Sequence, residues 1–557
     1  MINVGLDFGS TNSLVSVYKD GRVDSKNLFM GSPYVPSVVS FNKKRKKYQF
    51  GYSAKNSAGL RDITVYRAFK MLLREKEENL KQWQYDNENS PRAIAEQFIR
   101  YMLEAVCTSE GDHHIGKLTV GIPEFWRNDD KADVDGSAVI REICQNLDFV
   151  DEVQIVTEPE AASAYFAYEY LRRHHKNFSG HILLIDYGGG TLDLTLSEVK
   201  TQSESNSQYN MHIRTEKHTG AGDSHEGKIG QAALVYQEAV IMEAMRREGI
   251  LEPGQKITDI NFDYGEYCQL LNSLETQLLN NVADINEVFN DYLAGGIWYS
   301  VDDLEEEEFA WVSGKSTGLT ITYGLLVKVY LEEIKDILDA EIDKMIEYMD
   351  EHGIDWRHGN NDTFQLALVG GFGNFYLVDY QVKQKFNSIA VGHEVIAGSE
   401  RREQAIALGA ALYASNVIGL KYAAPSSMGI WSVDANKEPV FQYAFEQYDE
   451  LEMDVPHFVK NSIGTEAIFC SADGIFRDIL LVDGSDQQGR KYSLSDTEIK
   501  DIPVSDNKYF QVAFSVDAKE IFTMWIWDYN RKEKIRTSKY RKVRLNSLHR
   551  IRKNKQG

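Results

Sequence analysis

Two short segments of the sequence place an aspartate at the end of an apolar run, directly before a turn of small residues. Asp7 is followed by Phe8-Gly9-Ser10-Thr11-Asn12, and Asp186 is followed by Tyr187-Gly188-Gly189-Gly190-Thr191. Backbone N–H groups in such turns point into a concavity that suits phosphate oxygens, and hydroxyl side chains add donors. The carboxylate offers a hard oxygen to Mg²⁺, which keeps much of its hydration and is held through water. The pattern therefore predicts a site for phosphate and Mg²⁺.

A third glycine-rich turn, Gly370-Gly371-Phe372-Gly373, follows the apolar run at 364–369. One such turn alone is weak evidence, because an ordinary β-turn has the same composition. Two copies of the aspartate-plus-turn unit together with a third turn indicate a nucleoside triphosphate held between two lobes. The spacing matches neither a Walker A loop nor the Gly-x-Gly-x-x-Gly fingerprint of dinucleotide binding.

The elements around these turns predict an α/β fold. Each aspartate ends one expected strand, at 2–7 and 182–186, and a second strand follows each turn, at 14–18 and 192–196. The repetition suggests two related α/β halves that face each other. Helical patterns alternate with the strands, which is typical of partly parallel sheets; we expect them at 94–106, 138–147, 325–349 and 404–417. After Pro425 short strand-like segments separated by turns predict a small all-β domain.

Composition narrows the class of protein. The 557 residues are 43% hydrophobic and 26% charged, which excludes wholesale disorder. Four widely spaced cysteines exclude a disulfide scaffold or zinc ribbon and favour a reducing cytosol. A charge at Asp7 excludes a signal peptide, and the longest apolar stretch, 405–420, is shorter than the roughly 20 residues that span a bilayer. We therefore expect a cytoplasmic protein without a membrane span.

Charge is unevenly distributed along the chain. The net charge of −23 would repel a polyanion such as DNA over most of the surface. From Arg531 onward, however, the chain carries twelve Lys/Arg and one acidic residue, so this basic tail could contact RNA, an acidic protein or anionic lipid. A solubilising tail is the simpler interpretation. The acidic run at 302–308 is most simply a solvated loop.

The glycine turns resemble the two phosphate motifs of the actin/Hsp70/sugar-kinase ATPase superfamily, and the details resemble the Hsp70 family. Further segments resemble Hsp70 motifs in the same order: Phe50–Asn56, Thr64–Leu73, Val120–Trp126, Val156–Ala162, Gly222–His225, Leu368–Gly371 and Ala405–Ala411. The resemblance covers residues 2–415. It implies a two-lobed actin-like ATPase domain of duplicated ribonuclease-H-like halves, followed by a small all-β sandwich domain.

The resemblance implies a role for each matching residue. Asp7 and Asp186 would hold hydrated Mg²⁺ and position the attacking water. Lys70 would stabilise charge on the transferring phosphoryl group, and Glu158 would orient Mg²⁺ or water. Without the flanking match, Lys70 would read as a solvated lysine and Glu158 as an ordinary helix-start residue. The implied catalytic residues are Lys70, Glu158, Asp186 and Thr191. The implied ATP-binding residues are Asp7, Gly9, Ser10, Thr11, Asn12, Gly188, Gly189, Gly190, Thr191, Gly370, Gly371, Phe372 and Gly373.

Two features depart from the family pattern. The apparent counterpart of the family's adenosine clamp, Tyr267–Glu275, lacks its Glu, Lys and Arg pattern, and Asn374 stands where many relatives have arginine. Two alternatives follow: ATP binds weakly, or other groups hold the base, such as the ring of Phe372.

The second domain weakly resembles the Hsp70 substrate-binding β subdomain, most clearly at Tyr509–Asp528. No segment after Asp528 has the length and amphipathic pattern of the family's helical lid, so we expect a lidless domain. The expected organisation is a nucleotide-binding domain at 1–415, a linker at 416–427, a β sandwich at 428–530 and the basic tail at 531–557.

The sequence therefore predicts an ATP-dependent Hsp70-like chaperone. ATP hydrolysis would be coupled to binding of an unfolded or extended polypeptide client, and a co-chaperone or exchange factor would be a further partner. The alternatives are a nucleotide-gated actin-like scaffold, a pseudo-ATPase sensor that docks a protein partner, and a small-molecule kinase. The Lys70 segment and the appended β domain argue against the kinase.

Overall fold

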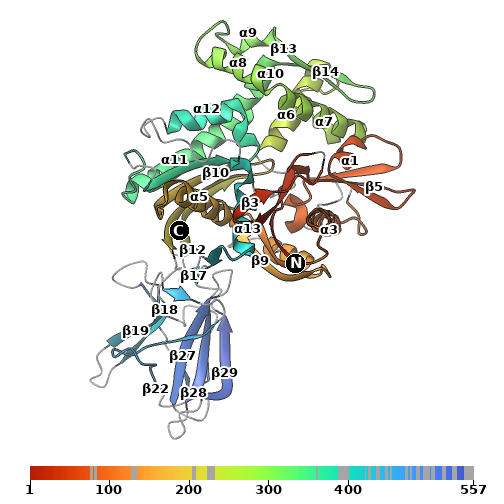
Figure 1. Cartoon of the computed structure of the whole chain (residues 1–557). Coiled ribbons are helices and arrows are strands. Elements are labelled where there is room, and N and C mark those ends of the chain that lie inside the picture. The colour runs from red at the N-terminus through yellow and green to blue at the C-terminus, as the bar shows by residue number, and fades with distance from the viewer. Residues whose placement is uncertain are drawn as a thin grey trace. The chain divides into compact units, whose positions relative to one another are not determined.

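The computed structural model describes the chain apart from residues 30, 76–79, 81–84, 127–134, 204–208, 223–231, 359–361, 387–400, 421, 424–427, 434–438, 446–448, 452–454, 471–474, 477–479, 484–489, 494–501, 504–508, 517–521, 530–535 and 545–557. It divides into two compact units, Met1–Gly419 and Leu420–Gly557 (Figure 1). Some segments named in the sequence analysis lie outside the described residues. They are Asp223, Ser224 and His225 of the Hsp70-like motif and much of the expected linker and basic tail.

The first unit contains two sheets in which four strands are arranged in the same way. In one, the order is β3-β2-β1-β8-β9, and β1 is antiparallel to β2 and parallel to β8. In the other, the order is β15-β10-β11-β12-β16, and β10 is antiparallel to β11 and parallel to β15. The expected repetition of an α/β half is therefore present in the strand pairing, and the mixed α/β class is confirmed.

Each sheet belongs to a lobe with its own apolar core. The first lobe comprises β1 (Ile2–Asp7), β2 (Asn12–Lys19), β3 (Arg22–Ser25), β4 (Val35–Pro36), β8 (Ile115–Ile122) and β9 (Val150–Thr157), the small sheet β6 (Lys47–Phe50), β5 (Val38–Asn42) and β7 (Ile63–Arg67), and helices α1 (Gly51–Asn56), α3 (Pro91–Glu110) and α4 (Gly136–Gln145). Local signals set the helix ends. At α3 the Ser90 side chain accepts a hydrogen bond from the Ala93 N–H, and Gly111 at φ 68° ends the helix.

The second lobe carries most of the remaining helices. Its sheet contains β15 (Phe364–Val369), β10 (Ser179–Tyr187), β11 (Leu192–Ser203), β12 (Tyr209–Ala221) and β16 (Ile418–Leu420). Around it lie α6 (Ala233–Arg247), α7 (Tyr264–Asn280), α8 (Val282–Leu293), α9 (Val301–Glu305), the hairpin β13 (Glu308–Ser313) and β14 (Gly318–Thr322), α10 (Tyr323–Tyr330), the π-helical turn η5 (Leu331–Lys335), α11 (Asp336–Glu351) and α12 (Tyr376–Lys385). The helix expected at 325–349 therefore continues through a π turn.

Two helices join the lobes. Helix α5 (Glu158–His174) follows β9 directly, and α13 (Ala405–Ala414) packs against both α5 and β1. A Cβ atom at Gly409 would collide with the backbone of Ala161, and one at Gly5 would lie 2.5 Å from the carbonyl oxygen of Ala407. The backbones therefore approach one another as closely as these glycines permit.

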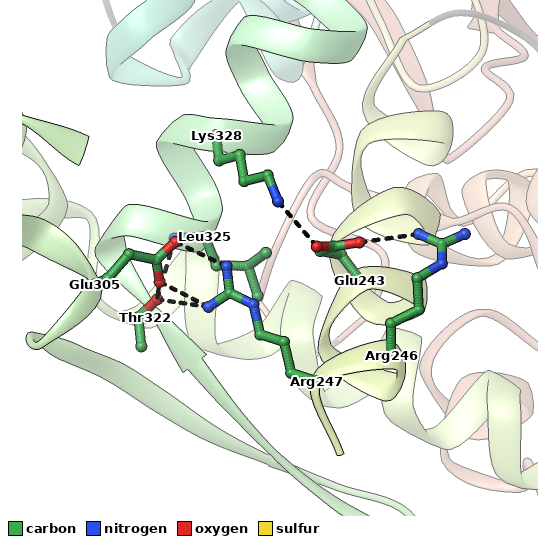
Figure 2. Close-up of polar contacts among 7 residues, drawn as sticks. All are labelled: Glu243, Arg246, Arg247, Glu305, Thr322, Leu325 and Lys328. Atoms are coloured by element: carbon green, nitrogen blue, oxygen red, sulfur yellow. Dashed lines mark hydrogen bonds and ion pairs between the residues drawn. The ribbon is translucent and has the colours of Figure 1, made fainter. Parts of the chain in front are cut away.

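An ion-pair network ties the outer helices of the second lobe together (Figure 2). The guanidinium of Arg247 on α6 donates to both carboxylate oxygens of Glu305 on α9, at 2.6 and 2.7 Å. On the same side, Glu243 of α6 lies 3.0 Å from both Arg246 and Lys328. The expectation of a loop at 302–308 is thus wrong for its first part, which forms α9 and makes an ion pair with α6, although Asp302 and Asp303 are exposed as expected.

The described part of the second unit is built of antiparallel strands. One sheet has the order β19-β18-β24-β25 and another the order β21-β27-β28-β29. They contain β18 (Met428–Val433), β19 (Pro439–Phe445), β24 (Leu480–Asp483), β25 (Arg490–Ser493), β21 (His457–Phe458), β27 (Tyr509–Val516), β28 (Phe522–Tyr529) and β29 (Arg536–Arg544). Strand β29 falls inside the segment expected to be a tail, so part of that basic segment extends a sheet.

One further finding concerns membranes. Within the described residues, no helix combines the length and the apolar character that crossing a bilayer requires.

Candidate functional site

The two sequence-predicted aspartates lie at equivalent strand ends. Asp7 ends β1, where it is opposite Leu14 on β2 and beside Gly121 on β8. Asp186 is the penultimate residue of β10, opposite Asp193 on β11 and beside Val369 on β15. Each aspartate therefore sits where its sheet gives way to a glycine turn, as the repeated pattern predicts.

The two glycine turns face each other. A Cβ atom at Gly189 would collide with the side chain of Thr11, and one at Gly190 would lie 3.2 Å from the Ser10 hydroxyl oxygen. The turns are thus in contact across the lobes, and a side chain on either glycine would separate them. Ser37 anchors the first turn, because its N–H donates to the Thr11 carbonyl and its hydroxyl donates to the Gly9 carbonyl, both at 2.7 Å.

The third glycine turn lies against Asp186. Gly370 has φ +79°, and a Cβ atom there would lie 2.5 Å from both Asp186 Oδ1 and the carbonyl carbon of Tyr187. Only glycine satisfies both the backbone conformation and the space. The structure therefore brings all three sequence-predicted turns to one place.

Lys70 and Glu158 form a buried ion pair at the same place. Their Nζ and Oε1 atoms are 2.6 Å apart, and the side chains are only 5% and 10% exposed. Lys70 also lies between two rings, 6.0 Å from the centroid of Phe8 and 5.9 Å from that of Trp126. Glu158 is the first residue of α5, whose Thr157 and Glu160 form a capping box. Lys70 is therefore not the solvated lysine that its type alone would suggest.

Burial and repulsion dominate the electrostatics of this cluster. Burial, followed by the charge of Glu158, raises the pKa of Asp7 to about 7, although Lys70 lowers it. Burial and then the charges of Glu158, Asp193 and Asp7 raise the pKa of Asp186 well above its ordinary value. Burial also raises the pKa of Glu158, against the lowering effect of Lys70. Excess negative charge is thus concentrated where the turns meet.

The donor chemistry of this cluster fits Mg²⁺. Carboxylates are the hard oxygen ligands that Mg²⁺ prefers. Burial and then repulsion raise the pKa values of Asp7 and Asp186, and a divalent cation would relieve the repulsion. No group of three or more His, Cys, Asp or Glu side chains within the described residues is arranged to bind a metal ion directly. Contact through water, as the sequence predicts, is compatible with both observations.

Comparisons with known proteins agree with this geometry. The family described as Hsp70 protein matches residues 3–204, which include both phosphate-type turns, Lys70 and Glu158. Over these residues the chain is similar to Hsp70 proteins.

Individual Hsp70 relatives are distant. A chaperone protein DnaK of Nitrosopumilus maritimus is 22% identical over 456 residues, covering 79% of this chain and 61% of the relative. A chaperone protein DnaK of Mycoplasmopsis agalactiae is 26% identical over 196 residues, covering 35% and 30%. Heat shock cognate 70 kDa protein 3 of Dictyostelium discoideum is 23% identical over 224 residues, covering 36% and 34%. The chain thus spans from about a third to three fifths of the length of these Hsp70 relatives.

The segment that departs from the Hsp70 adenosine-clamp pattern contacts the first lobe. Glu275 on α7 accepts from Lys55 at 2.9 Å and from Arg67 at 3.3 Å. Burial alone would raise the pKa of Glu275, but Lys55 and Arg67 lower it below its ordinary value. On the same helix, Gln269 donates to the Ala58 carbonyl at 2.8 Å and Asn272 bonds both Arg67 and the Lys55 carbonyl. This contact, which we call the rim contact, was missed by sequence reasoning.

Phe372 has a different environment from the one that base stacking needs. Its ring lies parallel to that of Phe375, with centroids 5.5 Å apart, and also contacts Tyr187 and Tyr236 at 5.0 and 5.4 Å. The side chain is buried in the core of the second lobe. Packing on several sides speaks against the expectation that this Hsp70-like chain uses Phe372 to stack on a base.

Two further residues near the cluster were not assigned by sequence reasoning. Asp193 stands opposite Asp186. The Nε2 atom of His218 on β12 lies 3.1 Å from Asp193 Oδ1. The Asp-x₆-Asp spacing, which puts both carboxylates beside the same turn of a hairpin, is a signal that could have identified Asp193. His218 follows an irregular stretch of β12, so no local pattern identifies it.

Proposed function

We propose that this chain is an ATP-dependent Hsp70-like chaperone, in which Mg²⁺-dependent ATP hydrolysis in the first unit is coupled to polypeptide binding by the second. One observation carries the proposal. The buried Lys70–Glu158 pair lies among carboxylates at the meeting point of two facing glycine turns, which is the arrangement that phosphoryl transfer needs.

In this proposal the two turns bind the triphosphate. The N–H group of Gly188 closes the turn by donating to the Thr191 carbonyl, and the N–H groups of 189 and 190 surround the β- and γ-phosphates together with the side chains of Ser10, Thr11, Asn12 and Thr191. Gly370–Gly373 closes the site beside Asp186. Asp7 and Asp186 hold hydrated Mg²⁺, which when bound neutralises phosphate charge. Positioning and fixed charge of this kind supply most of the catalysis in phosphoryl transfer.

Lys70 carries the transition-state charge in the proposed reaction. A water oxygen forms a bond to the γ-phosphorus while the bond to the bridging oxygen of ADP breaks, and the proton of the water leaves with phosphate or to solvent. The Lys70 ammonium stabilises the equatorial oxygens as negative charge spreads over them. Glu158, only 2.6 Å away, fixes the direction of the ammonium.

Single-turnover hydrolysis of ATP by the full chain tests the proposal. We expect slow, Mg²⁺-dependent hydrolysis that accelerates when an unfolded polypeptide, such as reduced carboxymethylated lactalbumin, is added. A folded protein of equal concentration is the control and should leave the rate unchanged. Hydrolysis that ignores the polypeptide would contradict coupling, and absence of hydrolysis at saturating Mg·ATP would contradict the ATPase itself.

The rim contact favours one second candidate, a nucleotide sensor that binds without turnover. Residues of α7 at the positions of the family's adenosine clamp bond instead to Lys55, Ala58 and Arg67 of the first lobe. Tight ATP binding together with no hydrolysis in the experiment above would select this candidate over the chaperone.

Glu275→Gln is expected to speed nucleotide release about three- to tenfold, because it removes the charge that two buried cations of the first lobe share. Stopped-flow dissociation of a fluorescent ATP analogue measures the rate. Glu305→Gln is the matched control, since Glu305 also bridges to a guanidinium but only within the second lobe. Equal release rates for wild type and both variants would show that the rim contact does not retain nucleotide.

A further inference from the structure

His218 and Asp193 form a histidine–carboxylate pair beside the candidate site. The His218 Nε2 atom lies 3.1 Å from Asp193 Oδ1, and the side chains are 23% and 10% exposed. The two residues lie on adjacent antiparallel strands, where His218 pairs with Thr195 and Asp193 pairs with Gly220, so the contact runs diagonally between β12 and β11. Both partners therefore lie in the regular part of the β11–β12 ladder, between its register shift and the second turn.

Asp193 links this pair to the cluster already described. It stands directly opposite Asp186 in the β10–β11 register, two residues after Thr191 of the second turn. Its charge contributes to the raised pKa values of both Asp186 and Glu158. A row of charged groups thus runs from Lys70 through Glu158 and the two aspartates to His218.

The surroundings of His218 favour its protonated form. Burial lowers the pKa of the imidazole, but Asp193, Glu124 and Glu341 together raise it above its ordinary value. These carboxylates approach from three different elements: β11, the short turn at 124–126 and α11. Glu341 is itself bonded to Thr219 and Lys344, whereas Asp193 is the group that His218 contacts directly.

We propose that His218 is a positioning residue for phosphoryl transfer, whose Nε2–H holds the Asp193 carboxylate in a fixed orientation beside Asp186. The inference rests on the proposed ATPase function. Four carboxylates meet at this site, so repulsion would favour turning one of them away unless a donor holds it. The contact with His218 supplies that donor for Asp193.

Kinetics of three variants test this role. His218→Leu should lower the single-turnover rate about tenfold while the KM for ATP stays within about twofold, because the lost contact orients a group rather than binding substrate. His218→Gln, which keeps an N–H donor, should recover part of the rate. In wild type the rate should fall as pH rises through the His218 pKa, because the imidazolium loses its proton. The His218→Gln variant should not show this fall.

His181→Gln is the matched control. His181 pairs with Glu216 at 3.2 Å in the same sheet, with side chains 24% and 12% exposed, but it lies near the opposite end of β10 from Asp186. Its variant should keep the wild-type rate and pH profile. Equal losses in the His181 and His218 variants would mean that both merely support the sheet, which would overturn the proposal.

An NMR titration tests the pair independently of hydrolysis. In full-length protein labelled at histidine, the signal missing from His218→Gln identifies His218, and its pKa should lie above about 6.5. Asp193→Asn should lower that pKa, whereas an unchanged value would overturn the proposal. If wild type hydrolyses no ATP while Asp193→Asn lowers the His218 pKa, the proposed function fails and the pairing stands without its catalytic role. Circular dichroism of each variant confirms that it is folded.

Discussion

Replacing Lys70 by methionine is expected to reduce the single-turnover rate of ATP hydrolysis about a thousandfold or more. A preorganised cation that meets charge only in the transition state contributes effects of this order in phosphoryl transfer. Methionine keeps the length of the buried side chain and its contacts with Phe8 and Trp126 while removing the ammonium. The rate is measured with labelled ATP and excess enzyme, so that product release does not limit it.

A control is required because breaking a buried ion pair can cost about 3–5 kcal/mol of stability. Protonation of Glu158, whose pKa burial already raises, limits that cost. Lys55→Met is the matched variant, since Lys55 is also a buried lysine in an ion pair, 2.9 Å from Glu275, but belongs to the rim contact. It should leave the chemical step unchanged. Wild-type turnover by the Lys70 variant would remove Lys70 from the catalytic assignment.

Asp7→Asn is expected to abolish Mg²⁺-dependent hydrolysis and at the same time to stabilise the nucleotide-free protein at pH 8. The pKa of Asp7 is raised from 3.8 to about 7, so the folded state binds this proton more tightly than the unfolded state does. Stability contributed by the neutral acid is present at low pH and is lost as pH rises from about 4 through 7. Asparagine cannot ionise and should recover on the order of 2 kcal/mol at pH 8.

Urea denaturation at pH 5 and pH 8 without nucleotide or Mg²⁺ measures this effect. The variant should gain stability over wild type at pH 8 and little at pH 5. Asp20→Asn is the control: Asp20 is exposed and has φ 52°, a conformation that asparagine adopts readily, so the variant should not change the pH dependence. A gain that is the same at both pH values would show that Asp7 is not the titrating group.

The parts of this structure that the sequence predicts are those encoded in short segments. Asp7 and Asp186 each end an apolar run before a small-residue turn, and that pattern alone indicates both the strand pairing and the meeting of the turns. The order of the motifs places Lys70 and Glu158 in the same site, and in the structure the Lys70 Nζ and Glu158 Oε1 atoms are 2.6 Å apart. Their catalytic roles stay predictions.

The parts that could not be predicted join residues far apart in the sequence. Glu275 meets Lys55 and Arg67 only because two lobes approach each other, and no local pattern encodes that approach. Phe372 stands in a recognisable turn, but whether an aromatic ring points to ligand or core depends on the packing of Tyr236 and Phe375 around it. The basic segment at 536–544 has the composition of a tail, yet pairing with β28 makes it a strand.

We expect the contact between α5 and α13 to act as a pivot between the lobes. Because backbone meets backbone at Gly409 and Ala161, the lobes cannot be drawn closer there, and every residue of α13 is buried, so separating them would expose the whole helix. Rotation is the motion that remains, and its displacement grows with the lever arm from the pivot. In Figure 1, α1 and α7 lie well away from α13 within the first unit. A small rotation of one lobe against the other should therefore change the distance between spin labels near residues 55 and 275 more than distances close to the pivot.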